Sequence, residues 1–391
     1  MTQAPRHDLS DDQRALLAGL EATLAPFDDA YWAACDRDAA FPEAFVEAMA
    51  QGGWLGLALP QEVGGEGLGV TEAALMMLEV ARRGGMTAAS AIHMNIFGPR
   101  AIVRHGTEAQ KAAWLPDILS GRARLCFAVT EPDSGLDTTA LTTRARRVEG
   151  GGWVVDGRKL WTSTAQRADR IMLIARTAPR DPARPAEGLS LFFAPFGREG
   201  AEVREIAKMG RAAVDSNALF LDGFSMPQDA LVGEAGQGFR ILLESLNPER
   251  ILIAAEAVGI GLSAVERASA YARERRIFGR PIGANQAIQH PLAAAWARLE
   301  GARLSTLAAA RAYDAGLPCG VEANAAKWLA AEAGMEACRA AVATHGGMGY
   351  AREYHVERLY REIMIPYLAP VSQQLALCFV AEKGLGLPKS Y

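Results

Sequence analysis

The sequence predicts a mainly α-helical protein with a central β domain. Apolar residues recur at helical spacing in the first third of the chain, and short β-type runs separated by turn residues fill the middle. Long Ala/Leu segments with short connections fill the remainder, which is typical of an antiparallel bundle. We expect an N-terminal helical domain (residues 1–125), a small β-barrel or sandwich (126–235) and a C-terminal four-helix bundle (236–391).

The N-terminal helices have clear start signals. Ser10 and Gln13 have the spacing of a capping box, and leucines follow at helical intervals up to Leu24. Pro42 is placed to open another helix from its first turn. Residues 71–83 and 88–105 are rich in apolar helix formers, so we expect two further helices there.

The character of the sequence changes near Cys126. Residues 126–130 favour a strand, and residues 153–161 favour a hairpin, because Asp156-Gly157 suits a type I′ turn. Further short strands are expected at 171–175, 189–193 and 218–221.

Helices dominate again after Gly236. Pro248 suits the first turn of a helix, so we expect a break before it. The predicted helical segments of this region are residues 239–245, 250–275, 289–315, 321–344 and 371–383.

Composition excludes several classes of protein. The net charge is -4 with both signs interspersed, so we expect no nucleic-acid partner and no polybasic membrane patch. No apolar run reaches the roughly 20 residues that span a bilayer, so no membrane insertion is expected. The five cysteines are scattered and the six histidines lack metal-ligand spacing, which indicates neither disulfides nor a metal site. The polar, acidic N-terminus has no signal-peptide pattern, so we expect the bacterial cytoplasm.

Six motifs follow one another in a recognisable order. Phe127-Ala-Val-Thr-Glu-Pro-Asp-Ser-Gly-Leu-Asp137 resembles the signature that opens the β domain of FAD-dependent acyl-CoA dehydrogenases. The other five motifs are residues 106–111, Lys159-Leu-Trp-Thr-Ser163, Lys208-Met-Gly210 with Asp215, Arg275-Arg-Ile-Phe-Gly279 with Gln286, and His345-Gly-Gly-Met-Gly-Tyr350. The resemblance extends from about residue 10 to the C-terminus.

This resemblance implies a division of labour: a protein base removes the α-proton of an acyl-CoA thioester, and N5 of FAD accepts the β-hydride. Phe127, Val129 and Thr130 would lie along the flavin edge. Trp161 would pack on the ring system and Ser163 would bond near N5. The alternative for Thr130 is an ordinary strand residue, and that for Trp161 is a core aromatic residue.

The remaining cofactor contacts are also implied by the resemblance. Arg275 would reach the FAD pyrophosphate across a subunit boundary, although a solvated basic cluster at a helix end is the alternative. Leu136 stands where a serine typically touches CoA and cannot donate that bond. The further residues assigned to FAD are Gly135, Phe278, Gln286, Gly346, Gly347, Ser372 and Gln374.

The position of the base departs from the commonest family pattern. Pro370 stands where most members carry the catalytic glutamate near the C-terminus. Isovaleryl-CoA and long-chain dehydrogenases instead place a glutamate directly before an arginine on a bundle helix, which matches Glu249-Arg250. We therefore expect Glu249 to be the base, with Glu256 as second candidate and Arg250 bracing the helix beside the substrate. The alternative for Glu249 is a first-turn carboxylate that stabilises the helix dipole.

Three functions compete at this stage. The first is acyl-CoA dehydrogenation with electrons passed to an electron-transfer flavoprotein by a homo-oligomer, expected to be a tetramer. The second is a flavin oxidase or monooxygenase on the same scaffold, and the third is a non-catalytic flavoprotein. The presence of Glu249 favours the first over the second, and the flavin motifs argue against the third.

Overall fold

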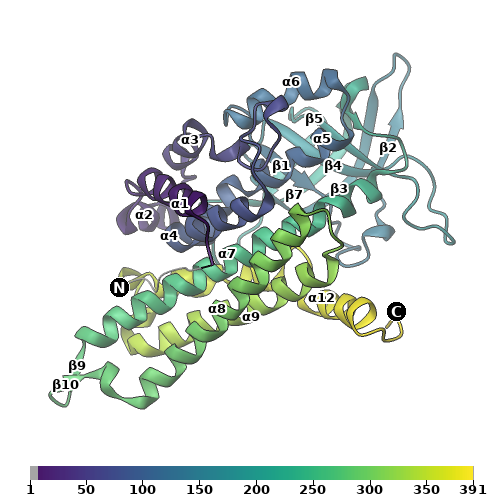
Figure 1. Ribbon diagram of the computed structural model, residues 1–391. Coiled ribbons are helices and arrows are strands. Elements are labelled where there is room, and N and C mark those ends of the chain that lie inside the picture. Colours follow the sequence, from purple (N-terminus) through teal and green to yellow (C-terminus); the bar gives the residue numbers. More distant parts are fainter. Residues whose placement is uncertain (1–7, 391) are drawn as a thin grey trace.

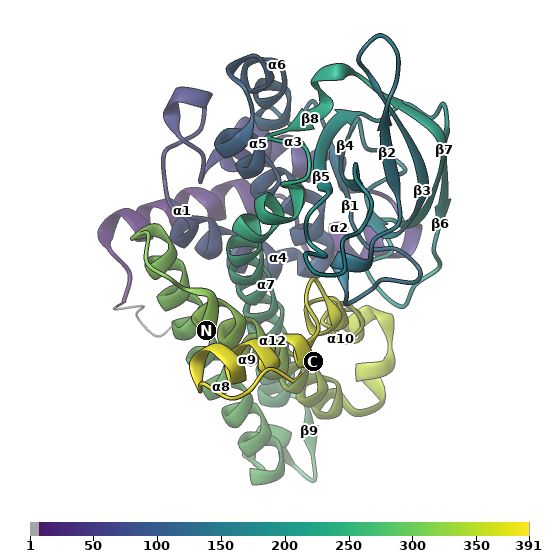
Figure 2. The same ribbon diagram turned by 90° about the vertical axis from the view of Figure 1, so that its right-hand side faces the viewer.

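The computed structural model describes residues 8–390. Helices at both ends of the chain flank a β region, as the sequence predicts, and the long helix α7 (Gly238–Glu274) runs through the centre of the molecule (Figure 1, Figure 2). This helix packs against α4 (Val70–Phe97) on one side and α9 (Gly320–His345) on the other. The largest apolar core lies along these contacts.

The N-terminal part consists of helices. Ser10 caps the first helix, and the predicted capping box with Gln13 is confirmed. Pro42 is the residue before its helix rather than part of the first turn. The helices are α1 (Asp11–Leu24), α2 (Asp29–Asp38), α3 (Glu43–Gln51), α4 (Val70–Phe97), α5 (Pro99–His105) and α6 (Glu108–Leu119).

One mixed sheet forms the β region. Its strand order is β6-β7-β3-β2-β4-β5-β8, and β1 pairs in parallel with β4. The strands are β1 (Leu125–Ala128), β2 (Arg144–Arg147), β3 (Trp153–Ser163), β4 (Arg170–Arg176), β5 (Leu189–Pro195), β6 (Ala201–Glu205), β7 (Ser216–Met226) and β8 (Leu231–Val232).

The hairpin predicted at residues 153–161 is wrong. The segment is one continuous strand, β3, which pairs with β2 and β7, and its register shifts at Gly157. Gly157 has a φ of 152° and packs closely on Thr143, so the Asp-Gly pair forms a bulge rather than a turn. Strand partners on both sides outweigh the local turn preference.

The bundle contains α7, α8 (Gln286–Asp314) and α9 as its long helices. The break predicted before Pro248 is wrong, because α7 continues through it. A proline inside a helix costs about 3 kcal/mol, and the extensive burial of α7 offsets that cost. The remaining elements are the hairpin of β9 (Arg276–Ile277) and β10 (Arg280–Pro281), and the helices α10 (Val356–Glu362), α11 (Met364–Leu368) and α12 (Gln373–Phe379).

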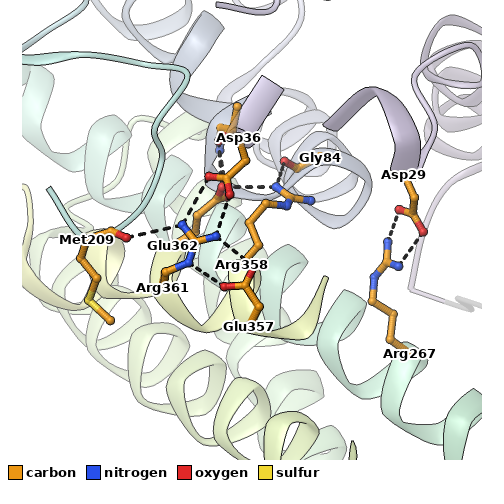
Figure 3. Close-up of polar contacts among 10 residues, drawn as sticks. Asp29, Asp36, Gly84, Met209, Arg267, Glu357, Arg358, Arg361 and Glu362 are labelled. Atoms are coloured by element: carbon orange, nitrogen blue, oxygen red, sulfur yellow. Dashed lines mark hydrogen bonds and ion pairs between the residues drawn. The ribbon is translucent and has the colours of Figure 1, made fainter. Parts of the chain in front are cut away.

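The predicted helices at residues 71–83 and 88–105 are joined differently from expectation. The chain stays helical through α4 except at Gly85, whose φ of 73° kinks the helix. Thr87 after the kink donates from its backbone N–H and its hydroxyl to the buried Glu362 of α10. Arg358 bridges Glu362 and the carbonyl of Gly84 (Figure 3). A buried ion pair from the C-terminal region therefore satisfies the polar groups exposed by the kink.

Candidate functional site

Glu249 lies in the interior of α7, and its side chain is only 8% exposed. The first-turn explanation of this residue is therefore wrong, because α7 begins at Gly238. Burial raises the pKa of Glu249 to about 7, while the charges of His93 and Arg250 act in the opposite direction. A carboxyl group with such a pKa is present in both its protonated and its ionised form near neutral pH, which suits a general base.

Glu256 lies two turns further along α7 and is fully buried. Its Oε1 is 2.7 Å from Nδ1 of His93 on α4, and its Oε2 has no hydrogen-bond partner among residues 8–390. Burial works against a charged imidazole, but Glu256 and Glu249 more than offset it and raise the pKa of His93. Glu256 is thus engaged with a histidine that faces both carboxylates.

A second polar group reaches this region from the β domain. The guanidinium of Arg211 donates to the hydroxyls of Ser163 (3.1 Å), Ser216 (2.7 Å) and Ser90 (3.0 Å). Ser90 and His93 are three residues apart on α4, so they share one face of that helix. This face of α4 therefore links Ser163 on β3 with the carboxylates of α7.

Sequence reasoning did not single out His93, Ser90 or Arg211. The sequence offers one signal for this group, because His93 is a titratable residue within a mostly apolar stretch of α4. Arg211 follows Lys208-Met-Gly210, which was recognised only as a motif. Their roles depend on contacts between segments more than 100 residues apart.

The residues assigned to the flavin edge lie together. The backbone N–H of Leu160 donates to the carbonyl of Thr130 at 2.8 Å, which places Thr130 beside Trp161. Phe127 is half-buried and packs edge-on against Phe97 of α4. Val129 and Ser163 are also half-buried.

Trp161 has an unusual conformation. Its φ is 61°, in the left-handed region that a bulky residue rarely adopts, and 55% of the side chain is exposed. The core-aromatic alternative is therefore wrong. A large indole held out of the core by a costly backbone conformation fits a role in stacking on a planar ring.

Glu131, within the signature motif, has a structural role. It pairs with the buried Lys159 at 3.0 Å and accepts hydrogen bonds from the backbone N–H groups of Thr142 and Thr143. Burial acts against its charge, but Lys159 and these bonds lower the pKa of Glu131 to about 2. Lys159 also donates to the carbonyl of Val129, so the pair fixes the flavin-edge segment to β3.

The other predicted cofactor residues lie elsewhere. Arg275 is exposed and Phe278 is fully exposed. They lie next to and within the β9–β10 hairpin, at the end of the bundle remote from the sheet (Figure 1). Exposed Gln286 begins α8, and exposed Gly346 and Gly347 follow α9. A single chain therefore does not bring Arg275 and Phe278 to the sheet that carries Trp161 and Ser163.

The last group of predicted residues has mostly local contacts. The Ser372 hydroxyl caps α12, and Gln374 is exposed. Gly135 and Leu136 are exposed beside Asp137, which caps the following turn. Arg250 donates to Asn247 at 3.0 Å, consistent with a bracing role, and its Nε has no hydrogen-bond partner in the described part of the chain.

Comparison with known proteins shows the family of the chain. The family models of the acyl-CoA dehydrogenase N-terminal, middle and C-terminal domains match residues 10–122, 126–224 and 236–370. The acyl-CoA dehydrogenase FadE12 of Mycobacterium tuberculosis is 36% identical over 386 residues, which cover 98% of each chain.

Solved structures are also similar. A glutaryl-CoA dehydrogenase in complex with glutaryl-CoA superposes with a TM-score of 0.92 at 32% identity, covering 98% of this chain and 97% of the other. The prolyl acyl carrier protein oxidase AnaB superposes with a TM-score of 0.88 at 26% identity, covering 97% of this chain and 100% of the other.

The chain belongs to the acyl-CoA dehydrogenase family. It is therefore an FAD-dependent oxidoreductase of the acyl-CoA dehydrogenase class. Within residues 8–390, no cluster of side chains is suited to hold a metal ion. In the same range no single helix has the length and apolarity to cross a membrane, although the bent pair Val356–Leu368 and Gln373–Gly384 meets the criteria together.

Proposed function

We propose that the chain oxidises an acyl-CoA thioester to the 2-enoyl-CoA, with Glu249 as the base. The observation that carries this proposal is the burial of Glu249 within α7, which raises its pKa to about 7. Pro370 cannot serve as a base, so a glutamate preceding Arg250 supplies what the usual C-terminal position lacks. This assigns the chain to the subgroup with its base on the bundle helix.

In this reaction the substrate loses its α-hydrogen as a proton and its β-hydrogen as a hydride, and a C=C bond forms between the two carbons. The Glu249 carboxylate takes the proton and becomes a neutral acid. FAD, when bound, supplies the acceptor for the hydride and its two electrons. Burial favours the neutral form of Glu249 over the charged one, so it also favours transfer of the proton to this carboxylate.

The residues near Trp161 fit a flavin. Trp161 offers an exposed aromatic face, Ser163 a hydroxyl and Thr130 a further polar group beside it. We expect exposed residues of the bundle to contact the cofactor of a neighbouring subunit, because the β9–β10 hairpin lies at the opposite end of the molecule from the sheet that carries Trp161 (Figure 1). These residues are Arg275, Phe278, Gln286, Gly346 and Gly347. A homo-oligomer, expected to be a tetramer, is part of this proposal.

The thioester carbonyl needs a donor other than the backbone of residue 370, since proline has no N–H. Ser372 and Gln374 follow it, but Ser372 is engaged as a helix cap. Electrons would pass from the reduced cofactor to an electron-transfer flavoprotein.

The test is anaerobic mixing of the purified protein with straight, branched and long acyl-CoAs while flavin bleaching is followed. Glu249→Gln should slow bleaching by roughly 10²–10⁴-fold, as expected for loss of a general base. Glu244→Gln, on the same helix but paired with His105, is the matched control and should bleach at the wild-type rate. Bleaching that survives in Glu249→Gln would transfer the role of base to another group.

A second candidate is a flavin oxidase on the same scaffold, which the similarity to the oxidase AnaB and the proline at residue 370 favour. Rapid reoxidation of the bleached enzyme by O₂, with release of hydrogen peroxide, would establish it. Slow reoxidation by O₂ and fast reoxidation by an electron-transfer flavoprotein would support the dehydrogenase.

A further inference from the structure

Arg211 is a buried cation whose guanidinium forms hydrogen bonds only with hydroxyl groups in the part of the chain that the structure describes. Its side chain is 5% exposed and donates to Ser90, Ser163 and Ser216. Within residues 8–390 no carboxylate forms a hydrogen bond with its side chain, and Glu362, Asp215 and Glu256 act on it only through their charge. Its Nε has no hydrogen-bond partner in that range. A buried charge without a direct partner is costly, so this arrangement calls for a compensating role.

The positive charge persists at neutral pH. Burial lowers the pKa of Arg211 to about 10, and the more distant carboxylates of Glu362, Asp215 and Glu256 act in the opposite direction. The charge of Arg211 also acts on His93 of α4, where it lowers the pKa of the imidazole and opposes the effect of Glu256. The guanidinium is therefore protonated at neutral pH.

Contacts from all three parts of the chain fix the segment that carries Arg211. Arg361 of α10 bonds Asp36 of α2 at 2.7 Å and also donates to the carbonyl of Met209 (Figure 3). Gly210 lies directly against the backbone of Arg361, where a Cβ would come within 3.0 Å. Arg211 itself has a φ of 58°, a left-handed conformation that these contacts hold in place. The guanidinium cannot easily turn toward solvent.

We propose that Arg211 is a positioning residue that stabilises the negative charge gained by the bound flavin on two-electron reduction, acting through the Ser163 hydroxyl. This inference rests on the proposed function, because it uses the placement of the flavin beside Trp161 and Ser163. Arrival of a hydride adds one negative charge to the cofactor while the substrate loses two electrons and one hydrogen nucleus. A fixed cation in a water-poor site stabilises that charge without reorganisation.

The test is the two-electron reduction potential of the FAD-loaded protein, measured anaerobically against a reference dye without any acyl-CoA. Arg211→Gln should lower the equilibrium preference for the reduced flavin at least tenfold, which corresponds to about 30 mV for a two-electron couple. Arg211→Lys keeps the charge and should retain most of the wild-type potential. Ser90→Ala removes one hydroxyl but no charge and should match wild type.

A second variant tests the charge without removing the arginine. Ser90→Asp places a carboxylate next to the guanidinium, whose Nη1 is 3.0 Å from the Ser90 hydroxyl. Ser90→Asp should also lower the reduction potential of the flavin, and it provides the test if Arg211→Gln does not fold. If Arg211→Gln and Ser90→Asp both fold, bind FAD and keep the wild-type potential, Arg211 only holds the domains together and the proposal is overturned.

The two proposals fail separately. A lowered potential in the charge variants, combined with no bleaching of wild type by any acyl-CoA, would overturn the proposed function and leave the role of Arg211 standing. Normal bleaching of wild type by an acyl-CoA, combined with an unchanged potential in the charge variants, would support the proposed function and overturn the role of Arg211. A folded protein that binds no FAD would overturn both.

Discussion

The imidazole Nδ1 of His93 lies 2.7 Å from Oε1 of Glu256, and this buried pair joins α4 to the same helix that carries Glu249. The raised pKa of His93 favours the imidazolium form, whose positive charge lowers the pKa of Glu249 and opposes the effect of burial. The pair therefore tunes the proposed base without being the base itself.

His93→Asn should move the activity profile to higher pH. Asparagine can keep the hydrogen bond to Glu256 but carries no charge, so the pKa of Glu249 should rise. The pH dependence of kcat/KM reports the free enzyme, and its lower midpoint should increase from near 7. His105→Asn is a matched control, because His105 forms a 2.7 Å pair with Glu244 outside the site. An unchanged midpoint in His93→Asn would show that His93 does not act on the base.

Glu249→Gln should make the protein more stable at high pH relative to wild type. The pKa of Glu249 rises from 4.5 to about 7 on folding, so its stabilising contribution is full below 4.5 and is lost as pH rises through 7. Glutamine is neutral at every pH, so the advantage of the variant should grow between pH 5 and 8, by up to about 3 kcal/mol. Urea unfolding across this range measures it, and parallel curves for the two proteins would contradict the buried-carboxyl assignment.

Gly85→Ala should destabilise the chain strongly. Gly85 has a φ of 73°, and a Cβ there would lie 2.4 Å from Oε2 of Glu362. The ψ of Gly85 is -162°, and this combination with a positive φ is essentially restricted to glycine, at a cost of about 1–3 kcal/mol for another residue. Displacement of the buried pair adds to that cost. Gly301→Ala is the control, since a Cβ on this exposed glycine of α8 meets nothing within 4 Å. That change should stabilise by about 0.4–1 kcal/mol, and equal melting shifts in both variants would contradict the role of the kink.

Glu131→Gln should cost about 3–5 kcal/mol, because it leaves the buried Lys159 without its counter-charge. The pKa of Glu131 falls from 4.5 to about 2 on folding, so its contribution is present above 4.5 and is lost as pH falls through 2. The gap between variant and wild type in urea unfolding should therefore narrow in acid.

The control for this change is Asp133→Asn. Asp133 forms an exposed 3.8 Å pair with Arg158 nearby, and its loss should change stability by less than about 0.5 kcal/mol. If both substitutions cost the same, burial would not be what gives the Glu131–Lys159 pair its importance.

Local patterns in the sequence were sufficient for several features. The capping box at Ser10 involves residues three apart, and the order of helices, strands and helices follows from periodicity alone. The six motifs placed the chain in its family, which the matching domain models confirm. The sequence also shows a proline at residue 370 in place of the usual glutamate, and it shows the Glu249-Arg250 pair. The role of Glu249 stays a prediction.

Only the tertiary structure decided what depends on distant neighbours. Gly157 became a bulge because strands on both sides pair with β3, and Pro248 stayed inside α7 because packing offsets its cost. The pairing of His93 with Glu256 joins residues 163 positions apart, and the hydrogen bond from Arg211 to Ser90 joins residues 121 positions apart. Burial and the field of neighbouring charges set the pKa of a side chain, and both arise only when separate segments pack together.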